Sequence, residues 1–110
     1  MAENMEHSAL TEAVYYILLS LYKPMHGYGI MQNIKELSNG RVTLGAGTMY
    51  GAINTLLEKG WIQPVAAYEE KSRKKEYLIT ELGKETIMLE ILRLNELLKN
   101  GNKITGGGLS

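Results

Sequence analysis

The sequence predicts one α+β domain, mostly α, built from three short helices, a two-stranded β-hairpin and a long C-terminal helix. Two observations lead to this prediction. Apolar residues recur at spacings of three and four in four segments, which is typical of amphipathic helices. Two runs rich in β-branched and aromatic residues flank the polar stretch "EEKSRK", which is typical of two strands and their turn. With 110 residues and 45% hydrophobic content, the chain can form one modest core.

The first helix is expected to start at Ser8, whose hydroxyl can cap it, and to stop near Lys23. Pro24 sets this limit because proline disfavours helical geometry in the residue before it. The apolar residues of this segment share one face at spacings of four, three, one and three: Leu10, Val14, Ile17, Leu18 and Leu21.

A second helix is expected to start near His26 or Gly27 and to end at "SNG", whose asparagine or glycine can take the left-handed cap. It should bury Ile30, Met31, Ile34 and Leu37. A third helix is expected over residues 46–59, with Gly60 as its C-terminal cap. The sequence therefore places two short helices before the hairpin, joined by a brief connection.

The two strands are expected over residues 61–68 and 74–80. Thr80 then caps a last helix that runs to about Asn100. The glycine-rich residues 101–110 should form a flexible tail. Three parts follow from this order: residues 1–79, residues 80–100 as a helix packed on them, and the tail.

Composition argues against catalysis. The chain has no cysteine and no aspartate, and its only histidines are His7 and His26. We therefore expect no metal, no cofactor and no enzyme activity. The stretch "GAGTMYG" matches neither the dinucleotide fingerprint nor the phosphate loop. The apolar runs are too short to cross a bilayer and no leader is evident, so we expect a cytoplasmic protein without a membrane partner.

The third helix has an unusual outward face. On a helical projection its buried stripe is Met49, Ile53, Leu56 and Leu57. The other side carries Gly47, Gly51 and Asn54, flanked by Thr48 and Tyr50. Glycine in a helix interior costs about 1 kcal/mol relative to alanine, so some benefit should offset it. A face this small can approach another surface closely, and the DNA major groove, about 12 Å wide, admits a helix.

This order of elements predicts a winged helix-turn-helix in which the third helix reads DNA and the hairpin is the wing. The cations Lys71, Arg73 and Lys74 lie at the hairpin tip, where they can contact phosphates. Asn54 is the candidate for a base edge, because an amide can pair with adenine twice. Two alternatives stay open: the small face could pack on a partner helix, and the basic tip could be a solvated turn.

The last helix carries more apolar residues than one small domain can cover. Ile87, Ile91, Leu94 and Leu98 alternate spacings of four and three, as in a coiled-coil seam. We expect this seam to form a homodimer interface, with packing on the chain's own domain as the alternative. A dimer would place two recognition helices about one DNA turn apart. Met5, Met88, Leu92 and Leu94 are the candidates to line an apolar pocket between subunits.

Three stretches resemble the PadR family of winged-helix transcriptional regulators in order and spacing: "YYILLSLYKPMHGYGIMQNI", "GAGTMYGAINTLLEKGWI" and "RKKEYLITELGKE". The resemblance covers roughly residues 8–90. It implies a homodimeric repressor that binds a partly palindromic operator in double-stranded DNA. Thr48 and Tyr50 match the threonine and tyrosine that begin the family's recognition helix, and Arg73 and Lys74 match its basic wing residues. Tyr77, Leu78, Thr80 and Gly83 match the segment linking the wing to the last helix.

The chain departs from the family pattern in three places. Ala46 and Gly51 stand where the family often has proline, and the last helix is expected to be short for the family, as in its short form without a further C-terminal domain. Some short members hold planar drugs between tryptophans of their last helices, whereas the only tryptophan here, Trp61, begins the wing. The predicted function is sequence-specific regulation of transcription, in which a small-molecule effector can release the protein from its operator. The runner-up is a winged-helix protein-interaction module without specific DNA binding, suggested by the net charge of zero.

Overall fold

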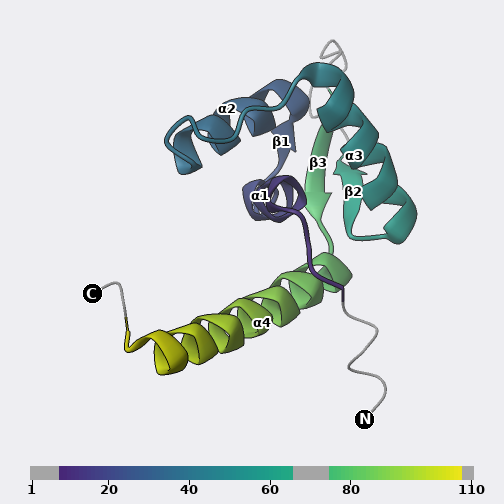
Figure 1. Ribbon diagram of the computed structural model, residues 1–110. Coiled ribbons are helices and arrows are strands. Elements are labelled where there is room, and N and C mark those ends of the chain that lie inside the picture. Colours follow the sequence, from purple (N-terminus) through teal and green to yellow (C-terminus); the bar gives the residue numbers. More distant parts are fainter. Residues whose placement is uncertain (1–7, 66–74, 108–110) are drawn as a thin grey trace.

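The computed structural model describes residues 8–65 and 75–107, and it confirms the mostly helical α+β fold with a small sheet and a long last helix (Figure 1). In chain order the elements are α1 (Glu12–Ser20), β1 (Met25–His26), α2 (Gly27–Leu37), α3 (Ala46–Lys59), β2 (Ile62–Val65), β3 (Glu76–Ile79) and α4 (Glu81–Thr105). Helices α1, α2 and α3 pack beside the sheet, and α4 begins directly after β3 and extends away from the rest of the domain.

The sheet has three antiparallel strands in the order β1-β3-β2. The predicted hairpin is present as β2 and β3, with Ile62 opposite Ile79. The predicted tip, residues 69–74, lies outside the described residues. Sequence reasoning missed β1, which pairs Met25 with Tyr77, because two residues are too few to show an alternating pattern. This short strand anchors the start of α2 to the wing.

Helix α1 begins three residues later than the sequence predicted. Thr11, not Ser8, is the N-cap, and its Oγ1 accepts a hydrogen bond from the Val14 N–H at 3.1 Å. Leu10 precedes the helix, and its N–H donates to Oε2 of Glu90 in α4 at 3.3 Å. This contact with α4 holds Leu10 outside the helix. A possible capping residue such as Ser8 does not show in the sequence that a distant segment binds the residue after next.

The connection between α2 and α3 is a tight turn built on Ser38. The Ser38 hydroxyl donates to the Ile34 carbonyl at 2.8 Å and accepts from the Val42 N–H at 2.9 Å. Asn39 and Gly40 follow with φ angles of 55° and 78°, so both predicted left-handed candidates adopt that conformation. The turn directs the chain into α3, whose bounds match the prediction and whose C-cap Gly60 is left-handed at φ 76°.

The core lies between α1, α2, α3 and the sheet. Its buried members are Ile17, Leu18, Leu21, Ile30, Ile34, Met49, Ile53, Leu56, Ile62, Tyr77, Ile79 and Ile87. The expectation for Leu37 is wrong: this last residue of α2 is 50% exposed, because none of the described elements covers that end of the helix. Met31 and Leu57 are only partly buried at the margin of the core.

Helix α4 begins at the predicted cap, where Thr80 Oγ1 accepts from the Gly83 N–H at 3.1 Å. It ends at Thr105, not near Asn100, so the expected tail boundary is wrong. Gly101 lies inside the helix, and the left-handed Gly106, with φ 86°, closes it. The glycine at 101 lowers helix propensity but does not stop a helix whose following residues continue it.

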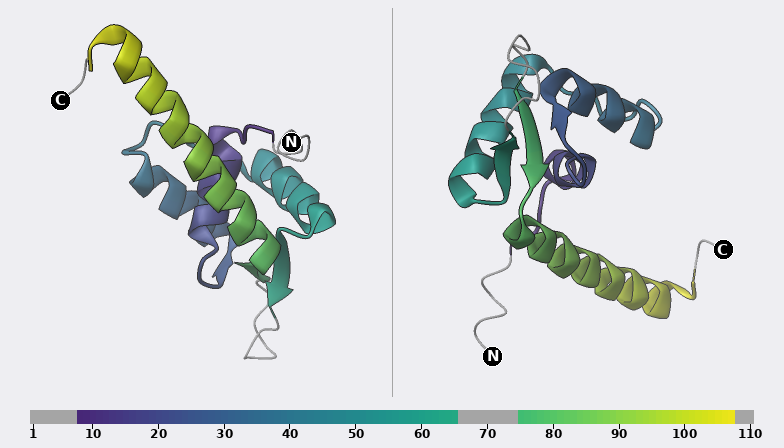
Figure 2. Two further views of the ribbon diagram at one scale, coloured as in Figure 1. Left: turned by 90° about the horizontal axis from the view of Figure 1, so that it is seen from below. Right: turned by 180° about the vertical axis from the view of Figure 1, so that it is seen from behind.

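The C-terminal half of α4 projects away from the domain (Figure 2). From residue 94 to residue 107 every residue is exposed. The molecule accordingly measures 56 × 35 × 21 Å. Among the described helices, none is both long and apolar enough to cross a membrane.

Candidate nucleic-acid interface

Helix α3 presents one face to the core and the opposite face to solvent. Met49, Ile53 and Leu56 are at most 1% exposed, which confirms three of the four members of the predicted buried stripe. The fourth, Leu57, is only partly buried. The five residues singled out for DNA contact are exposed: Gly47, Thr48, Tyr50, Gly51 and Asn54. The structure therefore brings these five together on one accessible surface, which we call the α3 face.

At the two glycines of the α3 face, no contact with the described residues requires the absence of a side chain. A Cβ atom added at Gly47 or Gly51 would meet no heavy atom of the described residues within 4 Å. Gly83 is the opposite case, because its Cβ would lie 2.2 Å from the Trp61 carbonyl oxygen. Packing against the Trp61 carbonyl thus explains Gly83, whereas no contact among the described residues accounts for Gly47 and Gly51.

Tyr50 is the one large side chain of the α3 face, and it is 46% exposed. The end of its ring lies against Gly27, the first residue of α2. Burial raises the pKa of the Tyr77 phenol, and the neighbouring Tyr50 phenol raises it further. Tyr50 therefore lies against the start of α2 on one side, while nearly half of the residue stays open to solvent.

An ion pair ties the approach to α3 to the start of α1. Arg41, which precedes α3, donates from Nη1 to Oε1 of Glu12 at 3.0 Å and also pairs with the other carboxylate oxygen. The hydrogen bond from Arg41 lowers the pKa of Glu12, and the same bond raises the pKa of Arg41. Both groups are exposed, so this pair orients the connecting turn more than it stabilises the fold.

The predicted wing cations Lys71, Arg73 and Lys74 lie outside the described residues. Lys75, which comes directly before β3, is exposed. The strands on either side of the undescribed stretch pair Val65 with Glu76. A role for the wing cations in phosphate contact stays a prediction.

The predicted dimer seam on α4 divides into two parts. Ile91, Leu94 and Leu98 are 39%, 40% and 62% exposed, so they are available to a partner. The structure corrects the prediction for Ile87, which is 1% exposed in the chain's own core. Ile87 lies in the part of α4 that covers the domain, whereas the other three lie where the helix leaves it.

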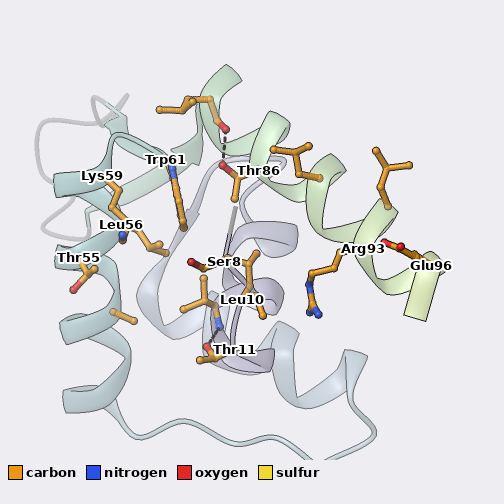
Figure 3. A pocket seen from close by; sticks show the side chains of 16 residues that line it. Ser8, Leu10, Thr11, Thr55, Leu56, Lys59, Trp61, Thr86, Arg93 and Glu96 are labelled. Carbon is orange, nitrogen blue, oxygen red and sulfur yellow. Dashed lines mark hydrogen bonds between the residues drawn. The ribbon is translucent and has the colours of Figure 1, made fainter. Parts of the chain in front are cut away.

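A cavity of about 950 Å³ opens between the segment before α1, the C-terminal half of α3 and the first turns of α4. Figure 3 shows Leu56 and Trp61 on the α3 side, Thr86 and Arg93 on the α4 side, and Leu10 in the segment between them. Of the candidates for an apolar pocket, Leu92 lines this cavity, Met88 and Leu94 do not, and Met5 lies outside the described residues.

Two charged contacts border this cavity. Glu90 is 2% exposed and pairs with Arg93, whose Nε donates to Oε1 at 2.8 Å, so the hydrogen bond raises the pKa of Arg93. Lys59 places its ammonium 5.1 Å from the ring centre of Trp61. In the part of the chain that is described, no three His, Cys, Asp or Glu residues gather to hold a metal ion. The sequence did not predict this cavity, because its walls come from three separate segments.

A family model for PadR-like transcriptional regulators matches residues 15–89 of this chain. The match begins within α1 and includes α2, α3, all three strands and the first turns of α4. The chain belongs to the PadR-like family of transcriptional regulators. The winged helix of this PadR-like protein is therefore a DNA-binding domain, and the expectation that it is not an enzyme agrees with the family.

Solved structures carry the same fold. A PadR family regulator from Clostridium difficile superposes with a TM-score of 0.72 at 23% identity, over 86% of this chain and 99% of that one. A transcriptional regulator from Thermoplasma acidophilum gives 0.66 at 26% identity, over 86% and 90%. Bacillus subtilis PadR, solved in complex with operator DNA, gives 0.61 at 25% identity, over 70% of this chain and 45% of that one. No curated protein sequence matches this PadR-like regulator.

Proposed function

We propose that this PadR-family regulator represses transcription by binding a partly palindromic operator as a homodimer, with the α3 face in the major groove. The observation that supports this proposal is the pair of glycines at 47 and 51, whose small size serves no contact within the described chain. Each glycine lowers helix stability, so an external surface that comes close to the helix gives a reason for both. Operator DNA bound to Bacillus subtilis PadR is consistent with that surface being DNA.

Within this proposal the residues of the α3 face have different roles. Asn54 reads a base edge, because its exposed amide can donate and accept toward adenine. Thr48 and Tyr50 donate hydroxyl hydrogen bonds to phosphate oxygens at the edge of the groove. Arg73 and Lys74 of the wing contact phosphates along the adjacent backbone, which adds affinity without sequence preference.

Dimerisation is supported by the projecting half of α4. Leu94, Leu97 and Leu98 are 40%, 52% and 62% exposed, in a part of α4 where every described residue is exposed. A single helical segment of this length is only marginally stable in water without packing. A second copy of α4 would cover these leucines and give the helix a partner. Light scattering coupled to gel filtration should then report a mass of two chains at micromolar concentration.

Release by a small molecule is the last part of the proposal, and the cavity supports it. Its walls include Thr55 and Leu56 of α3 and Leu89 and Leu92 of α4. An apolar compound bound there would touch both the reading helix and the dimerisation helix, so it could favour a different spacing of the two α3 faces. Trp61 in the wall supplies a fluorescence signal for screening planar aromatic compounds. A true effector should both quench Trp61 and lower operator affinity.

The deciding experiment is a fluorescence anisotropy titration against a duplex from upstream of the protein's own gene. A scrambled duplex of equal composition is the control, and each titration is repeated at two salt concentrations. The proposal expects tighter binding to the upstream duplex, two subunits per site and weaker binding at higher salt. Equal weak binding to both duplexes would mean that the protein binds this DNA only through electrostatic contacts without sequence preference. No binding at low salt would favour the protein-interaction module, which the net charge of zero also suits.

A further inference from the structure

Gly27 occupies a position where a side chain has no room. It is buried as the first residue of α2, and a Cβ atom there would lie 2.4 Å from Oη and 2.8 Å from Cζ of Tyr50. The methyl carbon of Met49 would also be 2.8 Å away. Gly27 is not among the positive-φ glycines of the described chain, so its backbone would accept alanine. A side chain at position 27 would therefore require the ends of the Tyr50 and Met49 side chains to shift, because the end of the Tyr50 ring fills the space.

The residues just before Gly27 connect the start of α2 to the sheet. β1 pairs Met25 with Tyr77, which places the sheet directly beside the start of α2. Tyr77 is 6% exposed, and its pKa is raised by burial and, to a smaller extent, by the Tyr50 phenol. The end of the Tyr50 ring lies against Gly27, which directly follows β1, while 46% of the residue remains exposed on the α3 face.

We propose that Gly27 is a positioning residue for DNA binding, which seats the Tyr50 phenol against the first turn of α2 and so fixes its hydroxyl at the edge of the α3 face. This inference rests on the proposed role of Tyr50 in DNA binding. A seated ring has lost its rotamer freedom before DNA arrives, so less ordering remains to be done on binding. A methyl group at position 27 displaces the ring and moves the hydroxyl away from its phosphate.

The test is a double-mutant cycle on DNA affinity with Gly27→Ala, Tyr50→Ala and the two combined. Gly27→Ala alone should weaken operator binding about tenfold, in the range for losing a hydrogen bond to a charged group. In the Tyr50→Ala background the same change should alter affinity by less than about twofold, because the ring that the methyl group displaces is then absent. Any effect of the contact with Met49 is common to both backgrounds and cancels in the cycle. Gly101→Ala is the matched control, since its added methyl meets no described atom within 4 Å. It should bind like wild type.

A signal that does not require DNA separates this inference from the proposed function. In spectra of ¹³C-labelled tyrosine rings, Gly27→Ala should shift the Tyr50 resonances and leave those of Tyr22, which lies beside Lys84, unchanged. Failure of the wild-type protein to bind any operator would refute the proposed function alone. Unchanged Tyr50 resonances would refute the proposed positioning of Tyr50 by Gly27, whatever the DNA-binding result.

The remaining outcomes also decide the question. Equal loss of affinity on adding Gly27→Ala in both backgrounds would mean that Gly27 acts without Tyr50, which overturns the proposal. If Gly27→Ala does not fold but the variant combined with Tyr50→Ala does, the rescue supports a steric seat. If neither folds, Gly27 serves the core rather than Tyr50, and the proposal is wrong.

Discussion

Replacing Gly51 by alanine should make the protein more stable and its DNA binding weaker. The residue lies inside α3, where alanine is favoured over glycine by about 1 kcal/mol. The added methyl meets no atom of the described chain within 4 Å, so no steric penalty offsets this gain. For a domain of this size, about 1 kcal/mol raises the melting temperature by roughly 4–8 °C.

The same methyl group should hinder DNA binding, because it projects from the α3 face that the proposal places in the major groove. Overpacking a close contact by one methyl group costs about 1–3 kcal/mol. A dimer meets this penalty at both recognition helices, so we expect a total of at least about 2 kcal/mol, equivalent to about a thirtyfold rise in Kd. Opposite signs for stability and affinity would distinguish a binding surface from a structural one.

The assay combines a thermal melt followed by circular dichroism with the anisotropy titration on the operator duplex. Gly101→Ala serves as the control, because it adds a methyl to an exposed helical glycine away from the α3 face. The control should gain stability without losing affinity. If Gly51→Ala is more stable and still binds the operator as tightly as wild type, the close approach of α3 to DNA is refuted.

Three further variants test other parts of the structure. Gly83→Ala should lower the free energy of unfolding by about 3 kcal/mol or more, because its Cβ would lie 2.2 Å from the Trp61 carbonyl oxygen, and a urea melt measures this. Leu94→Glu should convert the dimer to a monomer in light scattering, since it places a charge in the proposed seam. Combining Arg73→Ala with Lys74→Ala should reduce the slope of log K against log salt by about 2 in each subunit if both contact phosphate.

Each of these variants has a counterpart that isolates the cause. Gly101→Ala should not destabilise the fold, in contrast to Gly83→Ala. Asn100→Glu adds the same charge to an exposed position away from the seam and should leave the dimer intact. Lys99→Ala with Lys103→Ala removes two exposed cations of α4 and should keep the salt slope of wild type. An equal slope change in both double variants would contradict a specific role for the wing.

The sequence predicted well wherever a signal is local. Residues 46–59 were expected to be helical and are, and Gly60 and Thr80 cap as expected. A capping glycine or threonine satisfies backbone groups within a few residues of itself, so its position in the sequence is enough to predict where the helix begins or ends. The stripe Met49, Ile53 and Leu56 follows from helical periodicity in the same way.

The sequence failed where the outcome depends on a distant segment. Periodicity groups Ile87 with Ile91, yet the domain buries the first at 1% exposed and leaves the second 39% exposed. Leu37 continues the apolar pattern of α2 and still lies in solvent, because no element reaches it. Thr11 replaces Ser8 as the first cap because Glu90, eighty positions away, holds Leu10.

By itself the sequence determined the order of the four helices and of the two hairpin strands, the helix whose outward face is small, and the resemblance that leads to the PadR-like family. These depend on local propensities and on spacing along one chain. Only the tertiary structure decided that Gly27 faces Tyr50, that no described residue uses the small size of Gly47 and Gly51, and that α4 runs free beyond the domain. Such facts depend on which surfaces meet in space, and contacts between distant segments leave no periodic trace in the order of residues.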